Sequence, residues 1–291
     1  MIGVFYGLLS FLCFSIMNAS NKYVSFFKLA NLNSWLIYKN SFSLIIIFVV
    51  GIVIWKKSFF KSTNYKAVWI RALILAINQI CTIFAVKYLS LDMFYSITFL
   101  MPLMITFFGI IALKESPSSN NLIALLLGLI GSLIIMQPQL HSPQFIGIIL
   151  TFIVVLSGAS SAIIVKKYLP QENPVSSSMY IYILAVLISF LISDGTTKII
   201  YDVKIIAFSL FVAIIGILAT LLFMKAYQKS LAYKVAPTQY TQMIWGIIFG
   251  YAFFNDIPYF YTLIGSVVII IANYINLSKK NFFIGFKKND Y

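Results

Sequence analysis

The stretch AYQKSLAYKVAPTQYTQMIWGIIFGYAFFND at residues 226–256 corresponds to AVKYLSLDMFYSITFLMPLMITFFGIIALKE at residues 85–115. Each stretch begins with an alanine (Ala85, Ala226), continues through a long apolar segment and ends in an acid thirty residues later (Glu115, Asp256). The two stretches lie 141 residues apart. Self-similarity at a fixed offset predicts an internal repeat.

A second group of small residues recurs at nearly the same offset. Three pairs are separated by 140 residues: Gly7 and Gly147, Ala19 and Ala159, Ser20 and Ser160. Any one pair could arise by chance, because Gly, Ala and Ser are frequent in membrane helices. The common order and the near-constant offset of all the pairs favour a duplicated unit.

The composition excludes soluble and disordered classes. Of the 291 residues, 61 % are hydrophobic, 17 % aromatic and only 10 % charged, with a mean hydropathy of +0.97. Soluble domains are about half apolar and a quarter charged, and disordered chains are poor in aromatics. The chain is therefore predicted to be an integral membrane protein. Its net charge of +14 does not indicate nucleic acid as a partner, because the basic residues lie between apolar runs.

Ten apolar runs are long enough to be membrane helices, which need about 20 residues. They are too long and too continuously apolar for barrel strands. The first run lacks a basic segment before it, so we expect it to be retained rather than cleaved. The predicted spans are 2–22, 34–55, 67–88, 91–113, 121–137, 144–165, 175–194, 204–224, 233–254 and 257–278.

The distribution of Lys and Arg predicts the orientation. With a cytoplasmic N-terminus, fifteen basic residues fall on the cytoplasmic side, Arg71 among them, and six fall on the other side. Cytoplasmic loops carry the excess of basic residues. We expect a multi-pass protein of the cell inner membrane with both termini in the cytoplasm.

Five spans in each half imply an inverted repeat, because two halves with an odd number of spans insert in opposite directions. We expect an all-α fold of ten transmembrane helices in a 5+5 arrangement, with halves at 1–138 and 144–291, the second ending in a short basic cytoplasmic tail. Inverted repeats are typical of secondary transporters, which bind their substrate between the halves.

Several motifs resemble the EamA-type transporters of the drug/metabolite transporter superfamily. They are the segments 85–115 and 226–256, GLIGSLIIM from Gly128, and APTQYTQMIWGIIFGYAFFNDIP from Ala236. NKYV from Asn21, Lys39, and KAY from Lys225 resemble the bacterial S-adenosylmethionine uptake branch. The resemblance implies transport of a metabolite such as S-adenosylmethionine, and a cavity lined by spans one, three, four, six, eight and nine.

Polar residues inside predicted spans are the candidates for substrate binding, because polar groups are costly in lipid. Gln239, Gln242 and Trp245 share a helix face through their three-residue spacing. Interhelical hydrogen bonding is the alternative role for the amides, and for Lys39 it is extension toward the interface. The candidates are Asn18, Asn21, Lys39, Asn78, Gln79, Gln239, Tyr240, Gln242 and Trp245.

Three further residues are candidates for gating or structure. Pro102 lies in the middle of the fourth span, where it frees a backbone carbonyl and permits a kink. Glu115 and Asp256 follow the ends of the fourth and ninth spans, where a negative charge is unfavourable unless something offsets it. A cytoplasmic ion pair or gate contact is the expected offset.

We found no constellation for catalysis or metal binding in the sequence. Cys13 and Cys81 lie within apolar runs, and no Ser–His–Asp set or ligand cluster is present. We expect a secondary transporter of a small polar organic metabolite (S-adenosylmethionine or an amino-acid- or nucleotide-like solute) that works by alternating access, needs no cofactor or metal and is not an enzyme. Its expected partners are a small-molecule substrate and the lipid bilayer, and a homodimer is left open. The alternatives are a membrane-embedded enzyme, an assembly factor, or a drug or metabolite exporter.

Overall fold

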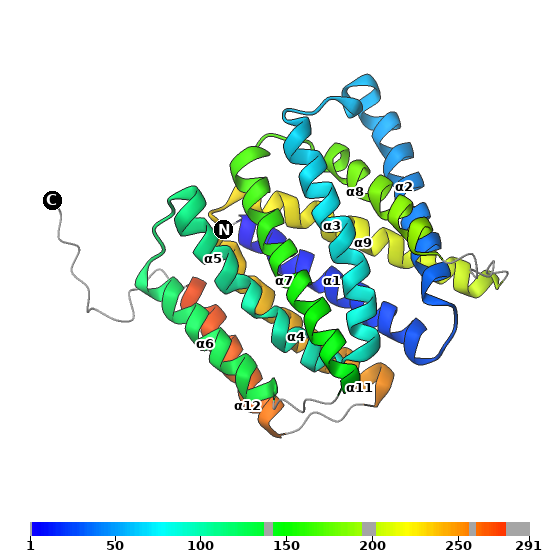
Figure 1. Ribbon diagram of the computed structural model, residues 1–291. Helices are drawn as coiled ribbons and strands as arrows, with labels where there is room; N and C mark the ends of the chain where they lie inside the picture. Colours follow the sequence, from blue (N-terminus) through cyan, green and yellow to red (C-terminus); the bar gives the residue numbers. More distant parts are fainter. Residues whose placement is uncertain (1, 137–141, 194–201, 256–259, 278–291) are drawn as a thin grey trace.

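The computed structural model describes residues 2–136, 142–193, 202–255 and 260–277. Every regular element in this part of the chain is a helix, as the sequence predicts (Figure 1). The elements are α1 (Ile2–Phe26), α2 (Leu32–Trp55), η1 (Lys56–Phe60), α3 (Tyr65–Tyr88), α4 (Leu91–Thr98), α5 (Leu100–Leu113), α6 (Ser119–Met136), α7 (Ser142–Tyr168), α8 (Pro174–Ile192), α9 (Val203–Lys229), α10 (Ala232–Val235), η2 (Ala236–Tyr240), α11 (Thr241–Phe254) and α12 (Phe260–Leu277).

Polar residues between the apolar runs fix where several helices begin. The side chains of Asn31, Asn64, Asn173 and Asp202 accept hydrogen bonds from backbone N–H groups at the starts of α2, α3, α8 and α9. These N-caps satisfy donors that have no partner inside the helix. Pro174 follows the cap of α8 and takes the first helical position, where its missing N–H costs nothing.

Two of the predicted spans are interrupted. The fourth is divided at Phe99 into α4 and α5, and the ninth into α10, the 3₁₀ turn η2 and α11. A left-handed residue follows each of these broken helices, Lys114 after α5 (φ 53°) and Asn255 after α11 (φ 55°). Their backbone N–H groups donate to Gly109 and Gly250, so the two helices end with the same geometry 141 residues apart.

The most extensive helix–helix contacts each join a helix from the first half of the chain to one from the second half. α1 packs against α9, and α7 packs against α3, while α2 lies beside α8 and α6 beside α12 (Figure 1). Small residues allow these close approaches. A Cβ on Gly3 would lie 2.3 Å from Ser230 Oγ, and a Cβ on Gly147 would lie 2.6 Å from Leu89 Cγ. Each half of the chain is therefore packed mainly against the other half.

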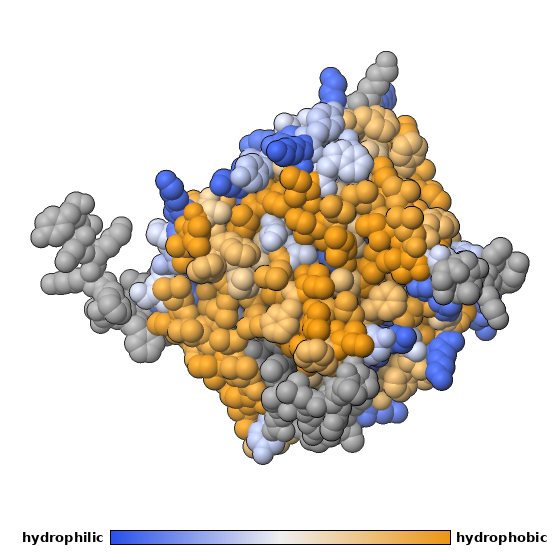
Figure 2. Space-filling model, viewed as in Figure 1, coloured by the Kyte–Doolittle hydropathy of each residue, from blue (hydrophilic) through white to orange (hydrophobic). Residues whose placement is uncertain are grey.

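Seven helices in the described residues are long and apolar enough to cross a membrane. They lie at Ile2–Phe26, Leu32–Ile54, Tyr65–Tyr88, Met93–Leu113, Phe145–Tyr168, Pro174–Ile192 and Val203–Lys229. Large apolar side chains such as Leu73, Ile149 and Phe152 are exposed on α3 and α7. Figure 2 shows a broad hydrophobic face over these helices, with the hydrophilic residues at its edges. An outer surface of this kind fits a lipid environment.

Candidate functional site

A cavity lies in the middle of the bundle, with about 930 Å³ of empty space including the part that is open to solvent. Residues from α1, α2, α3, α4, α5, α7, α8, α9, η2 and α11 line it, and none of the described side chains of α6 and α12 is among them. Elements from both halves of the chain therefore form one site. The expected list of six spans is covered, and the second and seventh spans (α2 and α8) also contribute.

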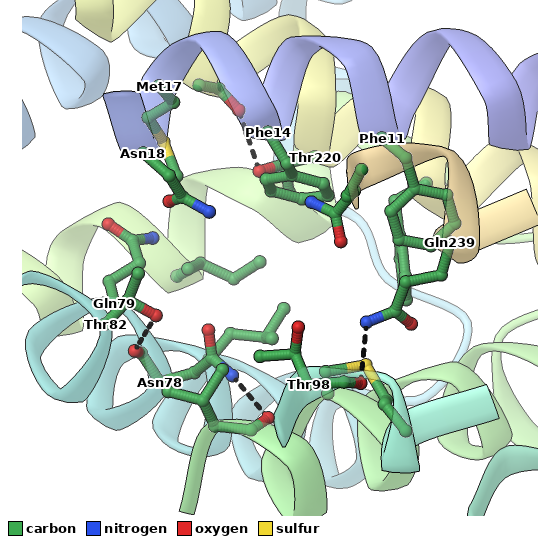
Figure 3. Close-up of a pocket in the computed structure, with 18 of the residues that line it drawn as sticks. Phe11, Phe14, Met17, Asn18, Asn78, Gln79, Thr82, Thr98, Thr220 and Gln239 are labelled. Carbon is green, nitrogen blue, oxygen red and sulfur yellow. Dashed lines mark hydrogen bonds between the residues drawn. The ribbon is translucent and has the colours of Figure 1, made fainter. Parts of the chain in front are cut away.

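One part of the cavity combines amide groups with aromatic rings (Figure 3). Phe11, Phe14 and Asn18 on α1 face the empty space from one side, and Asn78 and Gln79 on α3 face it from the opposite side. The Oδ1 atom of Asn18 is buried and has no hydrogen-bond partner. This part can hold a flat or apolar group and offers hydrogen-bonding atoms around it.

Two of the side chains that line the cavity are cationic. Lys39 on α2 is 3 % exposed and Arg71 on α3 is fully buried, and both line the cavity. Arg71 Nε donates to Ser161 Oγ (3.2 Å) and its Nη1 donates to Ser177 Oγ (2.9 Å). The third nitrogen, Nη2, has no partner. Tyr182 lies close to the guanidinium.

The interruption between α4 and α5 supplies a hydrogen bond to the cavity wall. Pro102 has no N–H, so the carbonyl of Thr98, four residues earlier, lacks its usual helical donor. Gln239 Nε2 of η2 donates to this carbonyl at 3.1 Å (Figure 3). Gln239 Oε1 remains buried without a partner and its side chain lines the cavity. Two helix irregularities from opposite halves thus meet at the site.

The structure brings six of the nine predicted binding residues to the cavity. They are Asn18, Lys39, Asn78, Gln79, Gln239 and Gln242. Asn78 also joins helices, because its Nδ2 donates to Val154 O (2.9 Å) and Ser157 Oγ (2.7 Å) on α7.

The other three predicted binding residues lie outside the cavity lining. Asn21 Oδ1 accepts a hydrogen bond from the Trp35 indole at 3.0 Å. Tyr240 is buried against Phe99 and Gly128, and its hydroxyl donates to Leu125 O at 3.1 Å. Trp245 stacks on Phe249 with ring centroids 6.3 Å apart. The contacts of Asn21 and Tyr240 join neighbouring helices, the alternative role considered for such residues, whereas the stacking of Trp245 lies within α11.

Of the gating candidates, Glu115 contacts the second half directly. Its carboxylate accepts hydrogen bonds from the backbone N–H groups of Ala232 (3.0 Å) and Tyr233 (3.3 Å). These are the first residues of α10, whose helix dipole favours a negative charge at this point. The unfavourable position of Glu115 after α5 is thereby offset by a second helix. Asp256 lies outside the described residues.

The sequence analysis did not predict that Arg71 is buried and lines the cavity. We counted it with the basic residues of the cytoplasmic side, but the structure buries its side chain between α3, α7 and α8. Its position could have indicated a buried role. Arg71 lies six residues after Tyr65, the first residue of α3, and a charged side chain that far inside a membrane span is costly unless it has a function. Ser43, Thr98, Tyr182 and Thr220 also line the cavity and were not candidates.

A bundle of apolar helices around a largely apolar cavity with several buried polar side chains is typical of multi-pass membrane transporters. The model of the EamA-like transporter family matches this chain twice, over residues 1–137 and 145–278, so the chain belongs to the EamA-like transporter family.

The curated relatives include both uptake transporters and an exporter. The chain is 26 % identical over 179 residues to S-adenosylmethionine uptake transporters of Rickettsia bellii and Rickettsia conorii. That match covers 60 % of this chain but only 60 % and 58 % of the length of those two relatives. A pseudopaline exporter, CntI, of Pseudomonas aeruginosa is 19 % identical over 203 residues, 70 % of this chain and 72 % of its own.

One solved crystal structure has the same fold. It superposes with a TM-score of 0.76 over 94 % of this chain and 96 % of its own, at 12 % sequence identity. At that identity the likeness concerns the fold alone.

Proposed function

We propose that this protein is a secondary transporter, and not an enzyme, that moves a small polar organic metabolite by alternating access between its two halves. The observation that carries the proposal is the central cavity, which both halves line and in which Asn18, Arg71 and Gln239 hold buried polar atoms without partners. Unpaired buried polar atoms are costly, so a site of this kind is stabilised by a polar ligand.

The alternating-access mechanism rests on an inverted 5+5 repeat of ten spans, with halves at 1–138 and 144–291. Two observations support it. The family model matches each half separately. The packing of α1 on α9 repeats as the packing of α7 on α3, which is the exchange of partners expected of two halves related by a pseudo-two-fold axis.

We further propose that the protein lies in a bacterial inner membrane with both termini in the cytoplasm. Arg71 and Lys39 are buried in the bundle and belong to neither membrane side. Without them the basic residues divide fourteen to five, so the predicted orientation is unchanged.

The solute is an amino-acid- or nucleotide-like metabolite in this proposal. The names of the Rickettsia relatives make S-adenosylmethionine one candidate. Amide groups beside Phe11, Phe14 and Phe94 in the cavity suit a solute with a ring and several hydrogen-bonding groups.

A thermal-shift screen of the purified protein against a metabolite library tests the proposal. A solute that binds only the folded protein raises its melting temperature. We expect at least one polar metabolite to do so in the wild type and to do so less in Gln242→Ala, a change within the cavity. A screen in which only lipids or prenyl compounds bind, and are chemically converted, would contradict the transporter proposal and support the enzyme.

A further inference from the structure

The charges of the cavity are unbalanced. Lys39 and Arg71 both line it and both are almost completely buried. No aspartate or glutamate is among its lining residues in the part of the chain that the structure describes. No hydrogen bond or ion pair of the Lys39 ammonium group is found within that part either. The two cationic groups therefore face the same empty space without a carboxylate.

The acidic residues in the described part of the chain lie near helix ends or between helices. None of them lies in the middle of a helix, and the whole sequence has seven acidic residues. They are Asp92 near the start of α4, Glu115 after α5, Glu172 in the turn between α7 and α8, Asp194 and Asp256 outside the described residues, Asp202 at the cap of α9, and Asp290 near the C-terminus.

The carboxylates of Glu115 and Glu172 are engaged elsewhere. Glu115 accepts from the backbone at the start of α10. Glu172 accepts hydrogen bonds from Ser62 Oγ (3.0 Å) and from the backbone and hydroxyl of Thr63 (2.8 and 2.6 Å). Neither carboxylate neutralises the cavity.

Hydrogen bonds hold the Arg71 guanidinium in place but do not use all of its nitrogen atoms. Serine hydroxyls from two helices of the second half, Ser161 on α7 and Ser177 on α8, fix two of its nitrogens. Neutral hydroxyls orient a guanidinium but supply no counter-charge. The remaining donor, Nη2, is buried without a partner. A pre-positioned guanidinium with a free donor is the group that binds carboxylates and phosphates best.

Buried charges are strongly destabilising unless an opposite charge pairs with them. We infer that the transported solute is an organic anion, and that its carboxylate or phosphate group pairs with the Arg71 guanidinium and the Lys39 ammonium group. The inference rests on the proposed transport function and defines its substrate class. The solute's remaining groups then occupy the amide and aromatic part of the cavity, where Gln239 Oε1 accepts an N–H or O–H.

This inference separates the candidate solutes. S-adenosylmethionine has a sulfonium, an ammonium and a single carboxylate at neutral pH, so its net charge is positive. A nucleoside monophosphate or an acidic amino acid is an anion of comparable polarity. The cavity of this chain favours the anions, whatever the relatives transport.

Efflux from proteoliposomes tests the solute charge directly. The vesicles are loaded with a small-molecule extract of bacterial cytosol to which matched probes are added: adenosine 5′-monophosphate with adenosine, glutamate with glutamine, and S-adenosylmethionine as the cation. Mass spectrometry compares what leaves these vesicles with what leaves protein-free vesicles. We expect organic anions to leave, with the nucleotide and the glutamate distinguishing phosphate from carboxylate.

Variants assign the effect to the two cations. Arg71→Gln and Lys39→Gln are each expected to slow efflux of the anion at low concentration by about tenfold or more, the loss expected for a hydrogen bond to a charged group. Arg71→Lys and Lys39→Arg keep the positive charge and should therefore keep the preference for anions. These two variants test the inference even if Arg71→Gln does not fold. Lys204→Gln removes an exposed lysine at the start of α9 and should change nothing.

Each outcome has one meaning. Anion efflux that depends on Lys39 and Arg71 supports the inference. Efflux of adenosine, glutamine or S-adenosylmethionine in preference to the anions overturns it while the transport function stands. If no solute leaves faster than from protein-free vesicles, the proposed transport function itself fails.

Discussion

Gln242 and Trp245 lie three residues apart on α11, but only Gln242 lines the cavity. The Gln242 amide is buried, and no hydrogen bond of its side chain is found within the described residues. Trp245 stacks instead on Phe249 of the same helix. The two positions therefore separate a binding role from a packing role on one helix.

The first prediction follows from this contrast. Gln242→Ala should raise the half-saturation concentration for transport about two- to twelvefold, the loss of one hydrogen bond of roughly 0.5–1.5 kcal/mol. Its melting temperature in detergent should stay close to that of the wild type. Trp245→Phe is the control and should leave the half-saturation concentration unchanged. Equal affinities for the wild type and Gln242→Ala would remove α11 from the binding site.

The sequence identifies polar residues within predicted spans, but it does not identify which of them line the cavity. Polarity selected Asn18, Lys39 and Gln242, which line the cavity, but it also selected Asn21 and Tyr240, which bond to Trp35 and Leu125. The difference depends on which helix lies opposite, and a single sequence does not contain that information. Arg71 was counted with the basic residues of the cytoplasmic side, although it lies inside the predicted span 67–88.

At the scale of elements, the fourth span shows how a proline acts away from its own position. The sequence predicts a kink at Pro102, but the helix is interrupted at Phe99. Pro102 lies in the first turn of α5, where N–H groups need no helical partner. Its effect falls on the Thr98 carbonyl, which accepts from Gln239 instead. The kink was predictable, and its partner on η2 was not.

Pro102→Ala gives the second prediction. The new N–H can donate to Thr98 O, which makes α4 and α5 continuous and weakens the contact with Gln239. We expect a lower maximal transport rate, since α5 can no longer hinge at Phe99. In a double-mutant cycle on unfolding free energy, Pro102→Ala and Gln239→Leu should show a coupling of about 0.5–3 kcal/mol. An unchanged rate together with additive effects would identify the break as packing only.

The third prediction concerns helix contacts through glycine. A Cβ on Gly128 would lie 2.2 Å from the ring of Tyr240, whereas one on Gly109 would lie 3.5 Å from Glu115 Oε2. Gly128→Ala should therefore destabilise the protein by about 1–3 kcal/mol through overpacking. Gly109→Ala, in a helix with room for a methyl group, should be neutral or stabilising by up to about 1 kcal/mol. Melting temperatures in the same detergent compare the two; similar losses in both would contradict the packing seen at Tyr240.

At the scale of the whole molecule, the exchange of partners between halves determines where the site lies. α1 packs on α9 and α7 on α3, so the cavity opens between elements that are distant in sequence. The all-helical fold of the described residues followed from long apolar runs, which one chain displays directly. The packing pairs did not, because they depend on three-dimensional arrangement.

In the proposed alternating-access mechanism, the contact between α5 and α10 is one that must break at one end of the bundle. Glu115 caps α10 there, and a Cβ on Gly109 would lie 3.9 Å from Ala232 Cβ. This separation matches the Cβ–Cβ distance of a disulfide. Gly109→Cys with Ala232→Cys, in a chain whose Cys13 and Cys81 have been replaced, should therefore cross-link the two halves on oxidation.

Counterflow of a labelled solute into proteoliposomes, measured on this double variant before and after oxidation, tests the central claim most directly. The reduced protein should show saturable counterflow of the solute found in the thermal-shift screen. Oxidation should abolish it and a reductant should restore it, because cross-linked halves cannot open that end of the cavity. Counterflow that persists at the same rate in the fully cross-linked protein, or its absence from the reduced protein and the wild type, would contradict transport by alternating access.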